Sequence, residues 1–177
     1  AGDAWLLRIN SSGTIVWSKL YGDAKWNTFE NISLGNNGAL AMSGFYENAN
    51  GIAEQWAADI SNNGTVNWQR QYPASINGND KGLFANDNGG YLLLYQTDRP
   101  LASRLDANGN LLQPTPLIDR GGFYFEDADK LPGNRIAAAG WRNGFAGIQG
   151  SDPTSRDFWM YVMDGDGKHI WNKTFGE

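Results

Sequence analysis

Three neighbouring carboxylates are the residues of this sequence that come nearest to a catalytic set. Glu126, Asp127 and Asp129 lie in the segment FEDAD (125–129), and a pair of carboxylates is what glycoside hydrolysis requires. The separation of the two carboxyl groups decides whether they act as a pair, and a sequence does not give it. A glycoside hydrolase, or a related hydrolase that uses these acids, is therefore one interpretation.

A second acidic group lies in the segment DGDG (164–167), where Asp164 and Asp166 offer oxygen ligands of the kind that Ca²⁺ prefers. The segment lacks the later ligands and the terminal Glu of an EF-hand loop, and the equivalent turns of the chain carry Asn, Ser or Asp. A hairpin turn stabilised by an Asp side chain is the simpler interpretation, with a weak calcium site as its alternative. No other cofactor is expected.

The sequence offers few residues that could act as a nucleophile or bind a metal ion. The chain has no Cys and a single His, His169, directly after the DGDGK turn. Cysteine nucleophiles, zinc–thiolate sites and histidine metal clusters are therefore excluded, and a Ser-His-Asp triad would depend on His169 without a nucleophile-elbow motif. We expect His169 to be an exposed strand residue and the protein to be non-catalytic.

The composition describes one globular domain. The 177 residues are 41% hydrophobic with 23 Gly and 8 Trp, and no apolar run approaches the ~18 residues of a membrane-spanning helix. A net charge of -5, with 14 scattered Lys and Arg, argues against nucleic acid as a partner. The chain starts AGDAW, without an initiator Met, so we expect a mature chain or a segment, secreted or at the cell surface.

One hairpin motif occurs four times. Its copies align without gaps and share a Gly after Asn, Asp or Ser residues, as a type I turn with a left-handed Gly requires. Each copy is followed, four residues after its last position, by a large apolar residue, which is period-2 spacing on one face of a strand. These residues are Tyr21, Tyr72, Leu117 and Phe175. The copies are WLLRINSSGTIVW (5–17), WAADISNNGTVNW (56–68), LASRLDANGNLLQ (101–113) and WMYVMDGDGKHIW (159–171).

A second unit lies between the hairpins, at 30–45, 81–96 and 126–141. Each copy has a polar segment, a Gly-containing turn and an apolar or small-residue strand, such as ALAMSG or RIAAAG. Trp5, Trp56, Leu101 and Trp159 stand 51, 45 and 58 residues apart, close to the ~40 to 50 residues of a propeller blade. The sequence predicts an all-β fold, a partial β-propeller of one outer half-blade (1–22) and three four-stranded antiparallel blades (23–73, 74–118 and 119–177).

These repeats resemble those of bacterial secreted β-propeller proteins, and are similar to quinoprotein-dehydrogenase-like propellers, whose blades carry a G-x-x-x-W motif. Here GTIVW, GTVNW and GKHIW supply Trp17, Trp68 and Trp171, while the third copy departs with GNLLQ. The resemblance implies that these Trp residues pack each blade against its neighbour. It does not carry quinone chemistry across, because no calcium-linked acidic ligands are identified. Trp5, Trp56 and Trp159 also recur, and we expect them to be structural.

Fourteen strands do not close a ring of four-stranded blades. The alternatives are a segment of a larger propeller, an assembly completed by another chain, and a small closed ring with an atypical blade. Pro114 and Pro116 predict that the outermost strand of the third repeat is an edge. Further blades, from the same parent protein or from another chain, are therefore expected partners.

Function is expected on the face that carries the long connections. Two Trp residues, Trp26 and Trp141, stand outside the repeat at or beside these connections, together with Tyr46, Phe123, Tyr124 and Arg142. Aromatic platforms beside polar groups suit a sugar ring or a peptide, so the sequence predicts a module that binds a glycan or a protein, without membrane insertion. The alternatives are that the rings cover blade ends, or that the chain is a purely structural repeat of a larger surface protein.

Overall fold

The computed structural model describes residues 2–23, 25–72, 78–116, 122–143 and 156–176, and almost all of their regular structure is β-strand. A two-stranded hairpin precedes three four-stranded antiparallel sheets, each with its strands in chain order. The prediction of an all-β fold built from such sheets is confirmed, and no sheet closes on itself within these ranges. The strands are β1 (Ala4–Ile9), β2 (Ile15–Tyr21), β3 (Asn27–Leu34), β4 (Leu40–Glu47), β5 (Ala53–Ile60), β6 (Val66–Gln71), β7 (Asn79–Ala85), β8 (Tyr91–Gln96), β9 (Pro100–Leu105), β10 (Leu111–Pro116), β11 (Phe123–Leu131), β12 (Arg135–Asn143), β13 (Arg156–Asp164) and β14 (His169–Phe175).

The four predicted hairpins form as the turn residues require. Their glycines, Gly13, Gly64, Gly109 and Gly167, all have a positive φ between 75° and 82°. In the last hairpin Oδ1 of Asp164 accepts the backbone N–H groups of Asp166 (3.0 Å) and Lys168 (2.8 Å). As Pro114 and Pro116 predict, β10 is an edge strand that pairs with β9.

The first strand of every four-stranded sheet contains a bulge, which the sequence does not predict. The pairing register shifts at Glu30 in β3, at Lys81 in β7 and at Glu126 in β11. Opposite the bulges of β3 and β11 stand Gly44 and Gly140, where a Cβ would collide with the carbonyl oxygens of Thr28 and Tyr124. The glycines in the ALAMSG and RIAAAG strands are thus required by the bulged partner strand.

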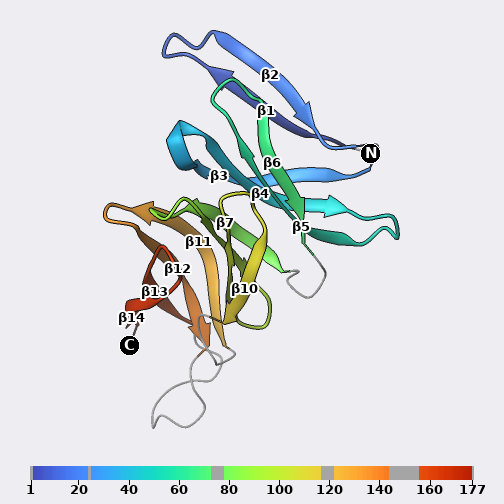
Figure 1. Ribbon diagram of the computed structural model, residues 1–177. Coiled ribbons are helices and arrows are strands. Elements are labelled where there is room, and N and C mark those ends of the chain that lie inside the picture. Colours follow the sequence, from blue (N-terminus) through green and yellow to red (C-terminus); the bar gives the residue numbers. More distant parts are fainter. Residues whose placement is uncertain (1, 24, 73–77, 117–121, 144–155, 177) are drawn as a thin grey trace.

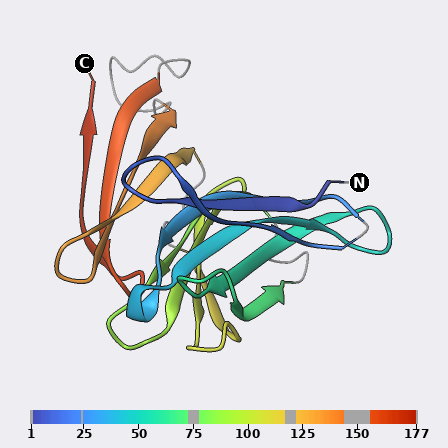
Figure 2. The same cartoon turned by 90° about the horizontal axis from the view of Figure 1, so that it is seen from above.

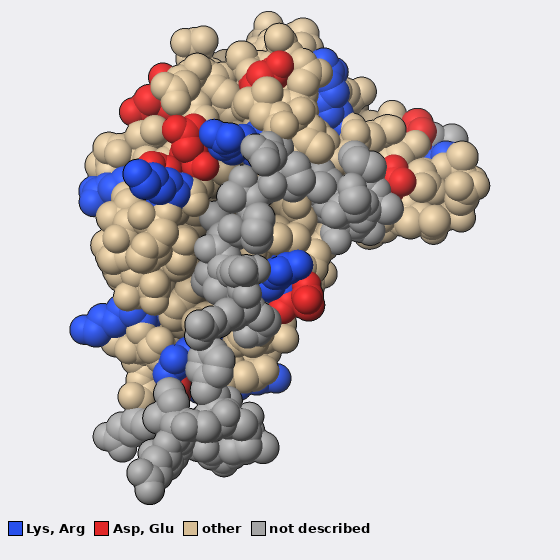
Figure 3. Space-filling model, turned by 60° about the horizontal axis from the view of Figure 1, so that its bottom comes forward, with Lys and Arg blue, Asp and Glu red and all other residues tan. Residues whose placement is uncertain are grey.

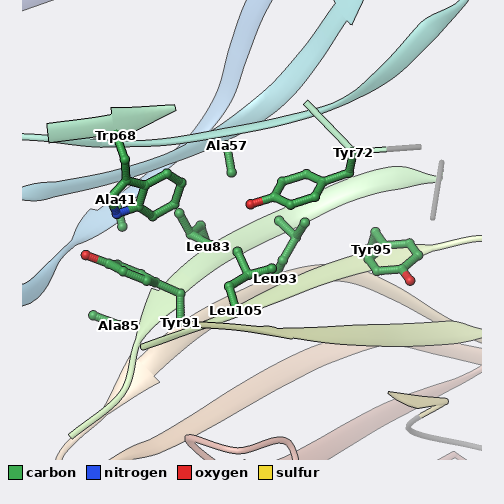
Figure 4. Packing of buried hydrophobic residues seen from close by; sticks show 10 residues of the cluster. All are labelled: Ala41, Ala57, Trp68, Tyr72, Leu83, Ala85, Tyr91, Leu93, Tyr95 and Leu105. Carbon is green, nitrogen blue, oxygen red and sulfur yellow. The ribbon is translucent and has the colours of Figure 1, made fainter. Parts of the chain in front are cut away.

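The hairpin and the three sheets stack face to face in chain order (Figures 1 and 2). Strand β7 lies beside β3 and β4 on one side and beside β11 on the other. Each pair of neighbours shares its own hydrophobic core, and Figure 4 shows the one between the β3–β6 and β7–β10 sheets. The three cores join the hairpin to β3–β6, β3–β6 to β7–β10, and β7–β10 to β11–β14.

In the first two stacking contacts, a Tyr side chain reaches the hairpin turn of the following sheet. The hydroxyl of Tyr21 donates to the carbonyl of Gly64, and that of Tyr72 donates to the carbonyl of Gly109, both over 2.9 Å. Trp68 lies against Gly109, where a Cβ would come within 2.5 Å of the indole ring. A ring at the end of one unit is therefore fixed to the turn glycine of the next.

The recurring Trp residues are buried only where a neighbour covers them. Trp68 is 8% exposed and Trp56 and Trp159 are buried. Trp171 on β14 is 42% exposed and Trp5 on β1 is 63% exposed, because the described chain places no sheet over those two end faces. The expectation that all six are packed is thus corrected for Trp5 and Trp171.

The surface carries no stripe of one charge on the face shown in Figure 3, where basic and acidic side chains are interspersed among uncharged ones. Within the described ranges, no helix is both long enough and apolar enough to cross a membrane.

Candidate functional site

Trp26 lies in an open hollow at the start of β3. The hollow measures about 390 Å³, and the indole ring is 46% exposed. The backbone there is fixed, since the carbonyl of Trp26 accepts the N–H of Glu47 over 2.9 Å. An aromatic ring, a carboxylate and an amide thus converge on one surface depression. The lining residues are Trp26, Glu30, Phe45, Ala53, Gly78 and Asn79.

Tyr46 lines a different, smaller hollow of about 130 Å³ beside the connection between β2 and β3. The ammonium group of Lys25 lies 5.8 Å from the centre of its ring. In the same hollow the side-chain amide of Asn27 donates to Asp23 over 3.1 Å. This hydrogen bond, followed by one from the Lys25 backbone, lowers the pKa of Asp23. Tyr46 therefore does not share the Trp26 hollow.

Trp141 belongs to a separate cluster on β11 and β12. Tyr124 stacks on it with ring centres 4.0 Å apart, and the guanidinium of Arg156 lies 4.1 Å from its ring centre. Its indole N–H donates to Oε1 of Glu126 over 2.6 Å. Residues of the chain itself therefore already occupy the ring face of Trp141 and accept its indole N–H.

Phe123 and Arg142, the two other predicted site residues, make structural contacts. Phe123 packs on Trp159, with ring centres 4.9 Å apart, at the edge of the core shared with the β7–β10 sheet. Arg142 forms an ion pair of 3.2 Å with Asp157 across β12 and β13. Of the six predicted residues, the structure brings only Tyr124 and Trp141 into contact as a pair of stacked rings. Trp26 and Tyr46 line two different hollows with polar groups, and the Trp26 hollow is the larger of the two.

The acidic side chains of β11 all form hydrogen bonds within the chain. Glu126 holds Trp141, as described, while Asp127 and Asp129 are exposed and each accepts the backbone N–H of the next residue. Among the described residues, no group of three or more His, Asp or Glu side chains is placed to hold a metal ion. Asp164 uses Oδ1 to close its own hairpin turn.

The structure also contains a buried carboxylate that sequence reasoning missed. Asp80 is 5% exposed and accepts hydrogen bonds from Asn31 (2.6 Å), Ser43 (2.8 Å) and Gln55 (2.6 Å), all on the preceding sheet. Burial raises the pKa of Asp80 to about 6. Oε1 of Gln55 is buried without a hydrogen-bond partner.

A signal for Asp80 was present in the repeat. Its aligned positions hold Phe29 and Phe125, which stack on Trp56 and Trp159 with ring centres 4.3 and 5.2 Å apart. An Asp in a position that is aromatic in both other sheets is a departure that the repeat alone does not require.

The comparisons with known proteins bear on the fold. No protein-family model matches this sequence, and the comparison with curated proteins finds no match. Among solved structures, the chain is similar to a protein of unknown function from Bacteroides caccae, solved at 1.35 Å resolution. The two share 12% identity with a TM-score of 0.51 over 94% of this chain and 73% of the other. A likeness at this identity shows the fold alone.

Proposed function

We propose that this chain is a non-catalytic binding module of a secreted or cell-surface protein, and that it binds a glycan at the Trp26 hollow. The observation that carries the proposal is the half-exposed indole of Trp26 beside the carboxylate of Glu30 and the amide of Asn79. An aromatic face packs against the C–H groups of a sugar ring, and the polar groups hydrogen-bond its hydroxyls.

Trp171 provides a matched control for Trp26. The two rings are exposed to similar extents, 42% and 46%, but Trp171 lies on the last strand, and the Trp26 hollow is formed by β3, β4 and the segments around them. Binding to a glycan array, followed by titration calorimetry with the best glycan, measures the affinity. Trp26→Ala is expected to weaken it about tenfold, and Trp171→Ala is expected to leave it unchanged.

Three outcomes would count against this assignment. Equal losses in both variants would indicate non-specific adhesion to exposed rings. Unchanged binding in Trp26→Ala would move the glycan site elsewhere. Binding to a protein in a pull-down, abolished by Trp26→Ala without any glycan signal, would replace the glycan with a protein ligand at the same hollow.

We further propose that the sheets are the blades of a β-propeller. Support comes from their face-to-face stacking, from the position of β7 between β3 and β11, and from the repeated hydrogen bond of a Tyr hydroxyl to a turn glycine. At the repeat position of the exposed Trp5, Trp56 and Trp159 are buried between sheets, and at that of the exposed Trp171, Trp68 is buried. Further blades, from the same parent protein or from another chain, are thus proposed to cover both end faces.

Light scattering tests the second of these sources. An assembly with other copies of the chain gives a mass that is a multiple of 19.4 kDa and falls when Trp5 and Trp171 are replaced by Ser. A stable monomer rejects completion by other copies of this chain and leaves blades of the same parent protein or of a different chain.

A further inference from the structure

A third pocket lies between the β3–β6 and β7–β10 sheets, at the end where the short turns gather. It measures about 510 Å³, within the ~300 to 1,000 Å³ typical of small-molecule sites. Its polar lining consists mainly of amides, together with one carboxylate, a phenol and a serine hydroxyl. The lining side chains that carry these groups are Asn36, Asn37, Asp59, Ser61, Asn62, Asn67, Tyr91 and Asn108.

Asp59 supplies the one carboxylate among the described residues that line this pocket. Asp59 is 4% exposed. Its Oδ1 accepts the side-chain amide of Asn67 over 2.5 Å, and its Oδ2 accepts the hydroxyl of Tyr91 over 2.6 Å. Asn67 belongs to the same sheet and Tyr91 to the next, so the carboxylate joins the two sheets. None of the described residues that line the pocket is a Lys or Arg.

All three residues depart from the repeat. Asp59 stands where the other hairpins have Arg8, Arg104 and Val162. Asn67 stands where they have Val16, Leu112 and Ile170, and Tyr91 stands where the other inner units have Leu40 and Ile136. A residue that stacking requires recurs from unit to unit. Asn67 and Tyr91 are polar where the other units are apolar, and both donate to Asp59, which stands in place of Arg or Val. The three residues together therefore meet a need of this interface alone.

An unpartnered donor lies next to this triad. Trp68 also lines the pocket, and its indole N–H is buried without a hydrogen-bond partner in the structure. The rings of Trp68 and Tyr91 meet edge to face with centres 5.1 Å apart. Figure 4 shows the indole nitrogen on the side of the ring that faces the Tyr91 hydroxyl. A buried N–H group without a partner is unfavourable, and a ligand hydroxyl or a water satisfies it.

The lining identifies the chemistry of the ligand. Amides both donate and accept hydrogen bonds, and the carboxylate accepts two more donors than it now has. The rings of Trp68 and Tyr91 are almost wholly buried, so they offer little face for stacking. A small molecule with several neighbouring hydroxyl groups fits walls of this kind. We propose that the pocket around Asp59 binds a monosaccharide, independently of the Trp26 hollow.

The indole N–H of Trp68 provides a direct readout. The ¹⁵N-labelled protein is titrated with D-glucose, D-mannose, D-galactose and N-acetyl-D-glucosamine, and the Trp68 signal is identified from its absence in Trp68→Phe. One of these sugars is expected to shift the Trp68 signal saturably while the Trp26 signal stays in place. A shift confined to Trp26 or no saturable shift of Trp68 with any of the four sugars overturns the proposal.

Two variants separate binding from folding. Asn67→Val restores the residue type of the repeat and is expected to weaken the sugar about tenfold, because it removes the amide and leaves Oδ1 of Asp59 without its donor. Asp80→Asn changes the other buried Asp of the same interface, away from the pocket, and is expected to leave the affinity unchanged. Equal affinities in Asn67→Val and the original chain contradict the site. Loss of glycan binding in Trp26→Ala, with this titration intact, separates the two proposals.

Discussion

The hydroxyl of Tyr91 donates to the carboxylate of Asp59 across the boundary between two sheets, over 2.6 Å. Both side chains are buried, and burial, followed by this hydrogen bond, raises the pKa of Tyr91 to about 12. The carboxylate has the amide of Asn67 as its other hydrogen-bond donor. This interface is therefore held by a charge-assisted hydrogen bond in addition to its apolar core.

Removing the Tyr91 hydroxyl should weaken the fold. Tyr91→Phe keeps the ring in its core and leaves one oxygen of a buried carboxylate without its donor, which costs about 1–3 kcal/mol. Urea unfolding followed by Trp fluorescence measures the loss. Tyr95→Phe is the control, because the Tyr95 hydroxyl interacts with the neutral Ser103 and its removal should cost about 1 kcal/mol or less. Equal losses in the two variants would contradict the role of Asp59.

Asp80 should make stability depend on pH. Its folded pKa of about 6 lies above the ordinary value of 3.8, with burial as the main cause. The folded state therefore binds its proton more tightly than the unfolded state does. The associated stabilisation is complete below pH ~4 and is lost as the pH rises through ~6, by up to about 3 kcal/mol.

The comparison for this prediction is Asp80→Asn, whose amide does not ionise. Urea midpoints between pH 4 and pH 7.5 should fall with rising pH in the original chain and fall less in the variant. Hydrogen bonds lower the pKa values of the carboxyls of Asp23 and Asp106, so both groups titrate below this window. The same pH slope in both proteins would show that another group is responsible.

Two turn glycines isolate the contribution of Trp68 docking. Gly13 and Gly109 occupy the same turn position with φ of 79° and 75°, but a Cβ on Gly13 meets nothing within 4 Å, and one on Gly109 meets Trp68 at 2.5 Å. Alanine at either position costs about 1 kcal/mol for the backbone. Gly109→Ala should cost about 1–3 kcal/mol more, because Trp68 must move. Equal unfolding free energies in the two variants would mean that Trp68 is not held against this turn.

Tyr72 offers a test of the hydrogen bond that joins one unit to the next. Tyr72→Phe removes the bond to Gly109 and is expected to cost about 1 kcal/mol, since Phe175 already occupies the equivalent position of the last unit. Tyr72→Ala also empties the core and is expected to cost about 3–5 kcal/mol. Thermal unfolding followed by circular dichroism measures the stability of the two variants. If Tyr72→Phe lost as much stability as Tyr72→Ala, the hydroxyl and not the ring would make the larger contribution.

The sequence predicts local structure well where one residue decides it. The glycines at 13, 64, 109 and 167 locate all four hairpins because their backbone conformation favours glycine. The bulges at Glu30, Lys81 and Glu126 carry no such mark, since a charged residue on a strand is compatible with many backbone conformations. The exposure of Trp5 and Trp171 depends on what covers them, which no residue of the motif encodes.

The site was harder to predict for a related reason. Trp26 stood out by lying outside the repeat, whereas Asp59 and Asp80 lie within it and differ only in residue type. Their partners Tyr91, Asn31 and Ser43 are between 32 and 49 residues away along the chain, so their meeting depends on how the sheets stack. For Asp80 and Tyr91 the available signal is a polar residue at a repeat position that is apolar in the other units, whereas the position of Asp59 holds Arg in two other hairpins and gives no such signal.

The buried polar groups between β3–β6 and β7–β10 also encode the order of the units. If β11–β14 followed β3–β6 directly, Asp59 would face Ile136 in place of Tyr91, and the donors of Asn31, Ser43 and Gln55 would face Phe125 in place of Asp80. Such a shuffled chain would bury polar groups without partners, and each would oppose folding. Recombination between these similar repeats is thus constrained, because two particular neighbours recognise each other.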